Sequence, residues 1–185
     1  MSKPTVLILP GWLGNGPDHW QSRWQALHGY QQVEQHDWQR PLRGDWTARL
    51  QDAVLAAPAG PVLLVAHSLG CILTAWWAAH SPQASRVAGA LLVAPPDIER
   101  DDNREKIPGW TPVMRRRLPF AATVIASSND PFGSLACASQ LAADWGADFL
   151  NLGPRGHINA ESGLGDWPEG HALLLDLAGR PGRHG

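Results

Sequence analysis

Short aliphatic runs alternate with segments of helical composition along most of the chain. The runs predict six strands, expected at 5–10, 32–36, 62–65, 87–93, 121–126 and 148–152. The segments between them are rich in Ala, Leu and Trp and predict helices, expected at 18–27, 45–57, 69–79, 132–145 and 167–177. Strands that alternate with helices in this way predict an α/β fold, with a parallel sheet and right-handed crossovers.

The sharpest change of pattern comes between a fully apolar run at 62–65 and the helical segment at 69–79. The intervening motif is Ala66-His67-Ser68-Leu69-Gly70, which matches a Gly-x-Ser-x-Gly nucleophile elbow with Ala in the first Gly position. Small residues two positions before and after the serine let the backbone turn sharply from strand into helix. We therefore expect the Ser68 hydroxyl to be exposed near a helix N-terminus that can stabilise an oxyanion.

Two further residues with suitable chemistry follow other strands. Asp130 comes after the run at 121–126, and His157 comes after the run at 148–152. The carboxyl ends of parallel strands meet at one edge of a sheet, so Ser68, Asp130 and His157 are expected to lie together. Their order along the chain, Ser then Asp then His, is that of α/β-hydrolases.

Each residue type in this constellation has a defined task. His157 can take the proton of a serine hydroxyl at neutral pH, and Asp130 would hold the imidazole tautomer and stabilise its cation. Two main-chain N–H groups are candidates for an oxyanion hole: Leu69, which follows the nucleophile, and Trp12, in the glycine-rich loop after the first strand.

Several competing assignments remain open at this point. Asp97 follows the strand at 87–93 and is the alternative acid. His67 adjoins the nucleophile, but its side chain is expected to point away from Ser68, and His171 falls within the last predicted helix. Both are therefore weaker candidates for the base. The ten tryptophans are expected to fill the core, with Trp20 and Trp24 on one helix face, although some could line a pocket.

Composition narrows the classes of protein that the chain can represent. It has 185 residues, 44% of them hydrophobic, with 15 basic against 17 acidic residues. This balance offers no basic surplus for nucleic acid, and no apolar run is long enough to cross a membrane. Two cysteines, Cys71 and Cys137, make no disulfide framework, and no secretory signal is evident, so we expect a cytoplasmic protein.

Cofactor and metal motifs are also missing from the sequence. The loop at 11–16 is not a dinucleotide-binding Gly-x-Gly-x-x-Gly, and the histidines and cysteines lack zinc spacing. We therefore expect no cofactor and no metal. The chain is expected to form a single domain over 1–185, with a polar segment at 94–119 that is either a surface insertion or a small cap over the site, and with a frayed tail at 179–185.

Five motifs together resemble a family of small serine hydrolases that includes retinoblastoma-binding protein nine and bacterial YdeN. The motifs are Pro10-Gly11-Trp12-Leu13-Gly14, Asp18-His19-Trp20 with Trp24, the Ser68 elbow, Ser128-Asn129-Asp130-Pro131, and Gly156-His157-Ile158-Asn159 with Ser162-Gly163-Leu164-Gly165-Asp166-Trp167-Pro168. The resemblance runs from about Thr5 to Leu177. It implies an α/β-hydrolase fold, a three-layer sandwich with a six-stranded parallel sheet in the order 2-1-3-4-5-6, and a triad of Ser68, Asp130 and His157.

The activity implied by the resemblance is that of a cofactor-independent, carboxylesterase-like hydrolase. It would cleave an ester, amide or thioester bond of a small acyl substrate through an acyl-serine intermediate. A low-turnover binding or regulatory module, and perhydrolase-type chemistry on the same triad, remain as alternatives. A retinoblastoma-type partner is not expected, because the Leu-x-Cys-x-Glu motif is absent: Leu135-Ala-Cys137-Ala-Ser139 lacks the Glu.

Overall fold

All six strands run parallel in one sheet, in the order β2-β1-β3-β4-β5-β6. The computed structural model describes residues 4–180. Its strands are β1 (Thr5–Leu9), β2 (Gln31–Gln32), β3 (Val62–His67), β4 (Val87–Val93), β5 (Ala121–Ala126) and β6 (Asp148–Asn151). The predicted strand order 2-1-3-4-5-6 is therefore confirmed.

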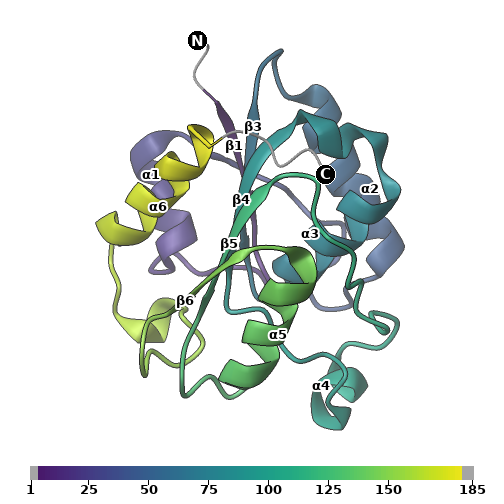
Figure 1. Cartoon of the computed structure of the whole chain (residues 1–185), viewed down its shortest axis with the longest axis vertical. Coiled ribbons are helices and arrows are strands. Elements are labelled where there is room, and N and C mark those ends of the chain that lie inside the picture. The colour runs from purple at the N-terminus through teal and green to yellow at the C-terminus, as the bar shows by residue number, and fades with distance from the viewer. Residues whose placement is uncertain (1–3, 181–185) are drawn as a thin grey trace.

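Helices cover both faces of this sheet, which gives the expected three layers (Figure 1). The helix α1 (Trp20–His28) and the helix α6 (Pro168–Ala178) lie on one face. The other face is covered by α2 (Arg43–Ala56), α3 (Leu69–His80) and α5 (Leu135–Trp145), while the short α4 (Asp101–Lys106) lies at the end of the molecule (Figure 1). Two short 3-10 turns, Pro82–Arg86 and Ala160–Ser162, complete the helical elements of the described chain.

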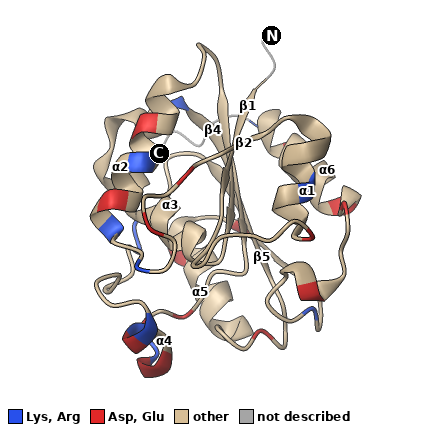
Figure 2. Ribbon diagram, turned by 180° about the vertical axis from the view of Figure 1, so that it is seen from behind, with Lys and Arg blue, Asp and Glu red and all other residues tan. Residues whose placement is uncertain are grey.

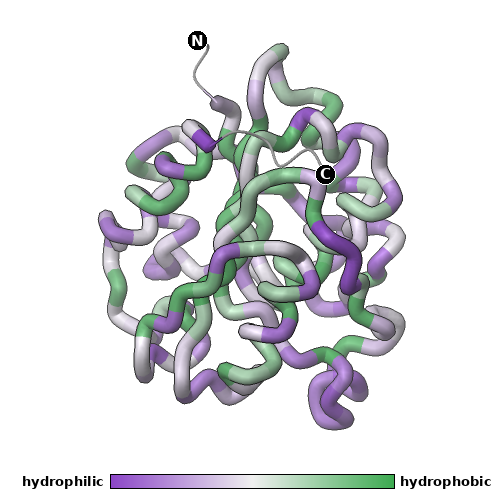
Figure 3. The backbone as a smooth tube through the Cα atoms, in the orientation of Figure 1, coloured by the Kyte–Doolittle hydropathy of each residue, from purple (hydrophilic) through white to green (hydrophobic). Residues whose placement is uncertain are grey.

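The strand β3 shows why the sheet is buried on both faces. Leu63 and Val65 pack into the apolar core beneath α1 and α6, and Leu64 and Ala66 pack into the core on the opposite face. Every residue of β3 is buried. The hydrophobic colour of the central strands in Figure 3 follows this pattern, which explains why a continuous apolar run, rather than an alternating one, encodes them.

The edge strands depart most from the sequence-based expectation. The second strand was expected at 32–36, but it spans only Gln31–Gln32, which pair with Leu7 and Ile8. This segment has one aliphatic side chain to bury, Val33, so little holds a longer strand against the sheet. The other edge strand, β6, is exposed throughout.

The segment at 94–119 was expected to be a surface insertion or a small cap over the site. It contains α4, and the residues Ile98, Ile107 and Trp110 within it are buried. At the other end of the chain, Arg180 donates to Asp176 at 2.6 Å. The rest of the predicted frayed tail, 181–185, lies outside the described residues. No helix within residues 4–180 is both long and apolar enough to cross a bilayer.

Candidate active site

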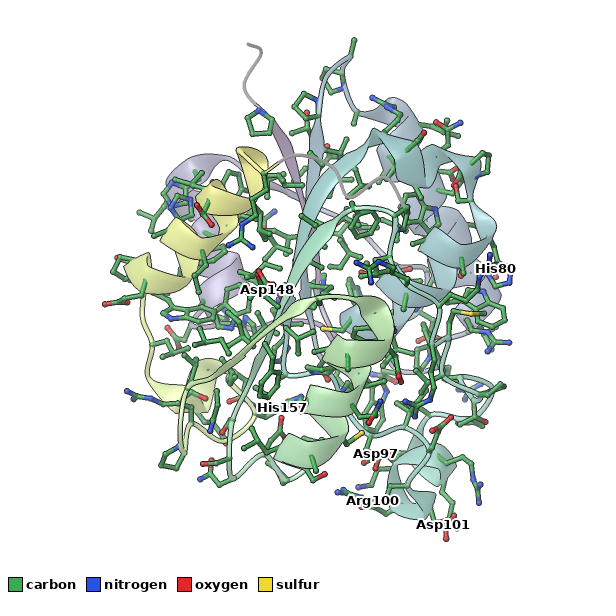
Figure 4. All side chains as sticks on the ribbon, viewed as in Figure 1. His80, Asp97, Arg100, Asp101, Asp148 and His157 are labelled. Atoms are coloured by element: carbon green, nitrogen blue, oxygen red, sulfur yellow. The ribbon has the colours of Figure 1, made fainter. Side chains whose placement is uncertain are left out.

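Ser68, His157 and Asp130 form one hydrogen-bonded chain at the carboxyl end of the sheet. The Nε2 atom of His157 lies 2.9 Å from the Ser68 Oγ, and its Nδ1 atom lies 2.9 and 3.0 Å from the two carboxylate oxygens of Asp130. An imidazole that donates from Nδ1 to the carboxylate presents Nε2 as an acceptor for the serine hydroxyl. The side chains of His157 and Asp130 are only 10% and 4% exposed. Figure 4 shows His157 at this end of the molecule, where α4 also lies.

The turn at Ser68 has the strained geometry expected of a nucleophile elbow. Its φ and ψ are 55° and −124°, a region that residues with a side chain rarely adopt, and α3 begins at the next residue. The Ser68 N–H donates to the Val93 oxygen at 2.9 Å, which fixes the turn to the neighbouring strand. A Cβ on Gly70 would lie 2.4 Å from the Leu9 oxygen, so only glycine lets α3 approach β1 this closely.

The glycine-rich loop after β1 packs directly against this turn. A Cβ on Gly11 would lie 2.7 Å from the Ser68 Cβ. The loop is fixed from behind, because the Trp12 indole donates to the Gln39 oxygen and the Leu13 N–H donates to the Trp38 oxygen, both at 3.0 Å. Among residues 4–180, the main-chain N–H groups of Trp12 and Leu69 find no acceptor, and both residues line the cavity beside Ser68.

The loop that carries His157 is held from three directions. The His67 Nε2 donates to the His157 carbonyl oxygen at 2.8 Å, and the Trp20 indole donates to the Ile158 oxygen at the same distance. The Asn129 amide oxygen, next to Asp130, accepts the Gly156 N–H at 2.7 Å. These bonds fix the loop main chain on each side of the imidazole.

Two further histidines next to the triad are held in the neutral form. Burial and the proximity of His157 lower the pKa of His19 to about 4 and hold the pKa of His67 well below its ordinary value. The His19 Nδ1 accepts the Gln21 N–H and caps α1, so a proton there would break the cap. Because His19 and His67 are neutral, neither places a positive charge beside the His157 ring.

The alternative candidates from the sequence make other contacts than those of the triad. The Asp97 carboxylate accepts the main-chain N–H groups of Glu99 and Arg100, which caps a turn ahead of α4 (Figure 4). His171 stacks on His28 with ring centroids 4.0 Å apart and bonds the Tyr30 hydroxyl. His67 hydrogen-bonds the His157 main chain rather than the serine. Asp130 is thus the carboxylate that contacts the His157 ring.

A cavity of about 320 Å³ opens beside Ser68 and His157. Apolar residues form much of its wall, among them Leu13, Pro96, Ile107 and Phe132. Of the tryptophans, Trp12 lines it, whereas Trp20 and Trp24 are buried in the core as predicted. Within residues 4–180, no three His, Cys, Asp or Glu side chains are grouped to hold a metal ion.

Some positions at the site have roles that the sequence did not predict. The donor role of His67 toward the His157 loop has no local signal, because it joins residues 90 positions apart. The sequence contains a weak indication that α4 forms part of the cavity wall, because Asn103, Lys106 and Ile107 have i, i+3, i+4 spacing.

The comparisons with known proteins agree with this geometry. The family model described as serine hydrolase matches residues 6–176. A YdeN-like hydrolase from Pectobacterium atrosepticum is 27% identical, with a TM-score of 0.83 over 95% of this chain and 91% of that one. The ydeN gene product of Bacillus subtilis is 20% identical, with a TM-score of 0.72 over 96% of this chain and 100% of that one.

More distant structures share the fold alone. Est1E from Butyrivibrio proteoclasticus, solved with ferulic acid bound, is 9% identical, with a TM-score of 0.71 over 96% of this chain and 87% of that one. A search of curated proteins found no match. The family match covers nearly the whole chain, and together with the YdeN-like fold it shows that this protein belongs to the serine hydrolase family.

Proposed function

We propose that this protein hydrolyses an ester bond of a small acyl substrate through an acyl-serine intermediate. The observation that carries the proposal is the bond chain from the Ser68 Oγ through His157 to Asp130, which ends beside a cavity. A serine hydroxyl becomes an effective nucleophile only when a base is positioned to take its proton, and His157 Nε2 lies 2.9 Å from it.

The first half of the reaction forms the acyl-enzyme. The Ser68 Oγ attacks the carbonyl carbon of the substrate while its proton moves to His157 Nε2. Negative charge develops on the carbonyl oxygen, where the N–H groups of Trp12 and Leu69 can donate to it. The tetrahedral adduct collapses, the bond to the leaving alcohol breaks, and His157 returns the proton to that alcohol.

The second half releases the acid. Water gives a proton to His157 Nε2 and attacks the acyl carbon, and a second tetrahedral adduct forms in the same oxyanion site. Its collapse breaks the bond to Ser68 Oγ and returns the proton to the serine. Asp130 stays ionised throughout and stabilises the imidazolium that forms twice in the cycle.

The small apolar cavity supports esters of short acyl groups as the substrate class. A volume of about 320 Å³ lies at the lower end of the range for ligand pockets. Ester, amide and thioester bonds would all pass through the same intermediate, and a good leaving group gives the most sensitive assay.

A panel of p-nitrophenyl esters with acyl chains of two to twelve carbons tests the proposal. We expect kcat/KM to peak among the short chains and to fall as the chain outgrows the cavity. The Ser68→Ala variant should retain the fold by circular dichroism and lose the activity. A folded wild-type protein that hydrolyses none of these esters above the Ser68→Ala background would contradict the proposal.

A further inference from the structure

Lys106 is the residue at the cavity whose charge the reaction does not use. Among the described residues that line the cavity, it is the only one with a permanent charge, and none is an Asp or Glu. Asp130 lies behind His157 and is not among the lining residues. The other titratable groups on the wall are histidines, of which burial keeps His19 and His67 neutral.

The helix that carries Lys106 is fixed to the catalytic loop. The Asn103 side-chain amide donates to the main-chain oxygens of Asp97 and Phe132, at 2.8 Å each, and Asn103 is 4% exposed. Lys106 follows three residues later on the same face of α4, and Ile107 follows at the C-cap, and all three line the cavity. These hydrogen bonds of the buried Asn103 fix the position of α4, and with it the position of the Lys106 backbone.

The ammonium group of Lys106 and the catalytic imidazole both lie close to the ring of Phe132. Its Nζ is 5.9 Å from the centroid of the Phe132 ring, and that centroid lies 4.6 Å from the centroid of the His157 ring. Phe132 itself follows Asp130 by two residues and donates its N–H to the Asp130 carboxylate at 2.9 Å. Because Lys106 lines the cavity and is also exposed, its side chain lies at the mouth of the cavity.

Two of the three acidic residues of α4 pair with arginines. Asp102 binds the Arg100 guanidinium through both oxygens, at 2.5 and 2.9 Å; this bond, with a smaller contribution from the Lys106 charge, lowers the pKa of Asp102. Asp101 binds Arg104 at 2.6 Å. Glu105 is adjacent in sequence and so points to a different side of the helix. Figure 2 shows this mixture of charges along α4.

We propose that the substrate carries an anionic group, a carboxylate in the simplest case, which Lys106 binds at the mouth of the cavity while Ser68 attacks the ester carbonyl. This inference rests on the proposed ester hydrolysis and names the substrate class. A single cation on an apolar wall without carboxylates attracts an anion and repels a second cation. Because the Lys106 side chain is exposed, the pairing gives anionic esters only a modest advantage.

Two matched pairs of alkyl esters test the proposal, with acid release followed in a pH-stat. The first pair is monoethyl adipate and ethyl hexanoate, which differ by a terminal carboxylate on the acyl side. The second pair is 4-acetoxybutanoate and butyl acetate, which differ by the same group on the alcohol side. We expect the anionic member of at least one pair to be preferred about 2- to 5-fold in kcat/KM at low salt.

Variants at α4 assign the preference to a residue. Lys106→Met should remove it, so that the two members of each pair have equal kcat/KM, while Lys106→Glu should invert it. Arg104→Met is the matched control, because it removes one positive charge from a residue of the same helix that is paired with Asp101 and does not line the cavity. It should leave the preference unchanged. No preference in wild type, or a preference that survives Lys106→Met, overturns the proposal.

A binding measurement separates this inference from the proposed function. Ser68→Ala protein should bind monoethyl adipate more tightly than ethyl hexanoate by ligand-observed NMR, and Ser68→Ala with Lys106→Met should not discriminate between them. Hydrolysis of neutral esters without any anion preference would leave the proposed function standing and overturn the anion site. Anion binding at Lys106 without hydrolysis of any ester would leave the anion site standing and overturn the proposed function.

Discussion

His67 donates its Nε2–H to the main-chain oxygen of His157 at 2.8 Å, across 90 residues of sequence. The histidine of the elbow motif therefore holds the loop that carries the catalytic His157. Because burial keeps His67 neutral, Nε2 has a proton to donate while Nδ1 has none. The His67 side chain thus joins the strand end that presents Ser68 directly to the loop that presents His157.

Replacing His67 tests this connection. His67→Ala leaves a buried carbonyl without its donor, which should cost about 1–3 kcal/mol of folding free energy by urea unfolding. Displacement of His157 should lower kcat about 10- to 100-fold with little change in KM. His67→Gln, which can still donate an N–H, should recover much of kcat. An unchanged kcat in His67→Ala would show that the bond supports only the fold.

The choice between two carboxylates gives a second prediction. Asp130→Asn should lower kcat about 10⁴-fold, because an amide favours the wrong imidazole tautomer and cannot stabilise the imidazolium. Asp97→Asn is the control, since its side-chain oxygen can still accept the N–H groups of Glu99 and Arg100. It should stay within about twofold of wild type. Equal losses in the two variants would point to a shared structural effect.

The close approach of α3 to β1 predicts a large effect from a single methyl group. Gly70→Ala would place a Cβ 2.4 Å from the Leu9 oxygen, and the backbone shift should destabilise the fold by about 2–4 kcal/mol. Gly44→Ala provides the comparison, because no atom lies within 4 Å of its Cβ position in α2. That variant should gain up to about 1 kcal/mol from helix propensity. Thermal and urea unfolding of both variants would measure the contrast.

Acid stability depends in part on His19. Its pKa is about 4 in the folded protein and near 6.5 when unfolded, so the unfolded chain binds the extra proton between these values. Stability from this group is complete above pH 6.5 and falls as the pH drops towards 4, by roughly 3 kcal/mol in all.

His19→Asn isolates that contribution. Its side-chain oxygen can replace the Nδ1 acceptor that caps α1, and it does not titrate. The free energy of unfolding should therefore decline less steeply in the variant, by up to about 1.4 kcal/mol per pH unit between pH 6.5 and 4. Parallel declines in the two proteins would show that other groups account for the acid sensitivity.

The central strands and the strand order follow from simple rules of pattern. The apolar runs that became β3, β4 and β5 need burial on both faces, and only a parallel sheet with helices on each side provides it. The position of Ser68, Asp130 and His157 after three of the strands was enough to predict that they meet at one edge. The short β2 was less predictable, because one aliphatic residue carries little signal about where an edge strand ends.

The contacts that hold the site were harder to predict because they join distant parts of the chain. Trp20 was expected in the core from its spacing with Trp24, and its burial confirms this. Nothing in the local sequence indicates that its indole N–H donates to the Ile158 oxygen, 138 residues away. Likewise, the polar composition of α4 masked the single face, with Asn103 and Lys106, that forms the cavity wall.

The most direct test of the proposed chemistry is covalent labelling by a fluorophosphonate, which reacts with a serine activated by a neighbouring base. We expect wild-type protein to acquire one adduct, located by peptide mass spectrometry on Ser68, and Asp130→Asn to label far more slowly. Folded Ser68→Ala protein should not be labelled. A folded wild-type protein that stays unlabelled, or labelling that persists in Ser68→Ala, would contradict the assignment of Ser68 as the nucleophile.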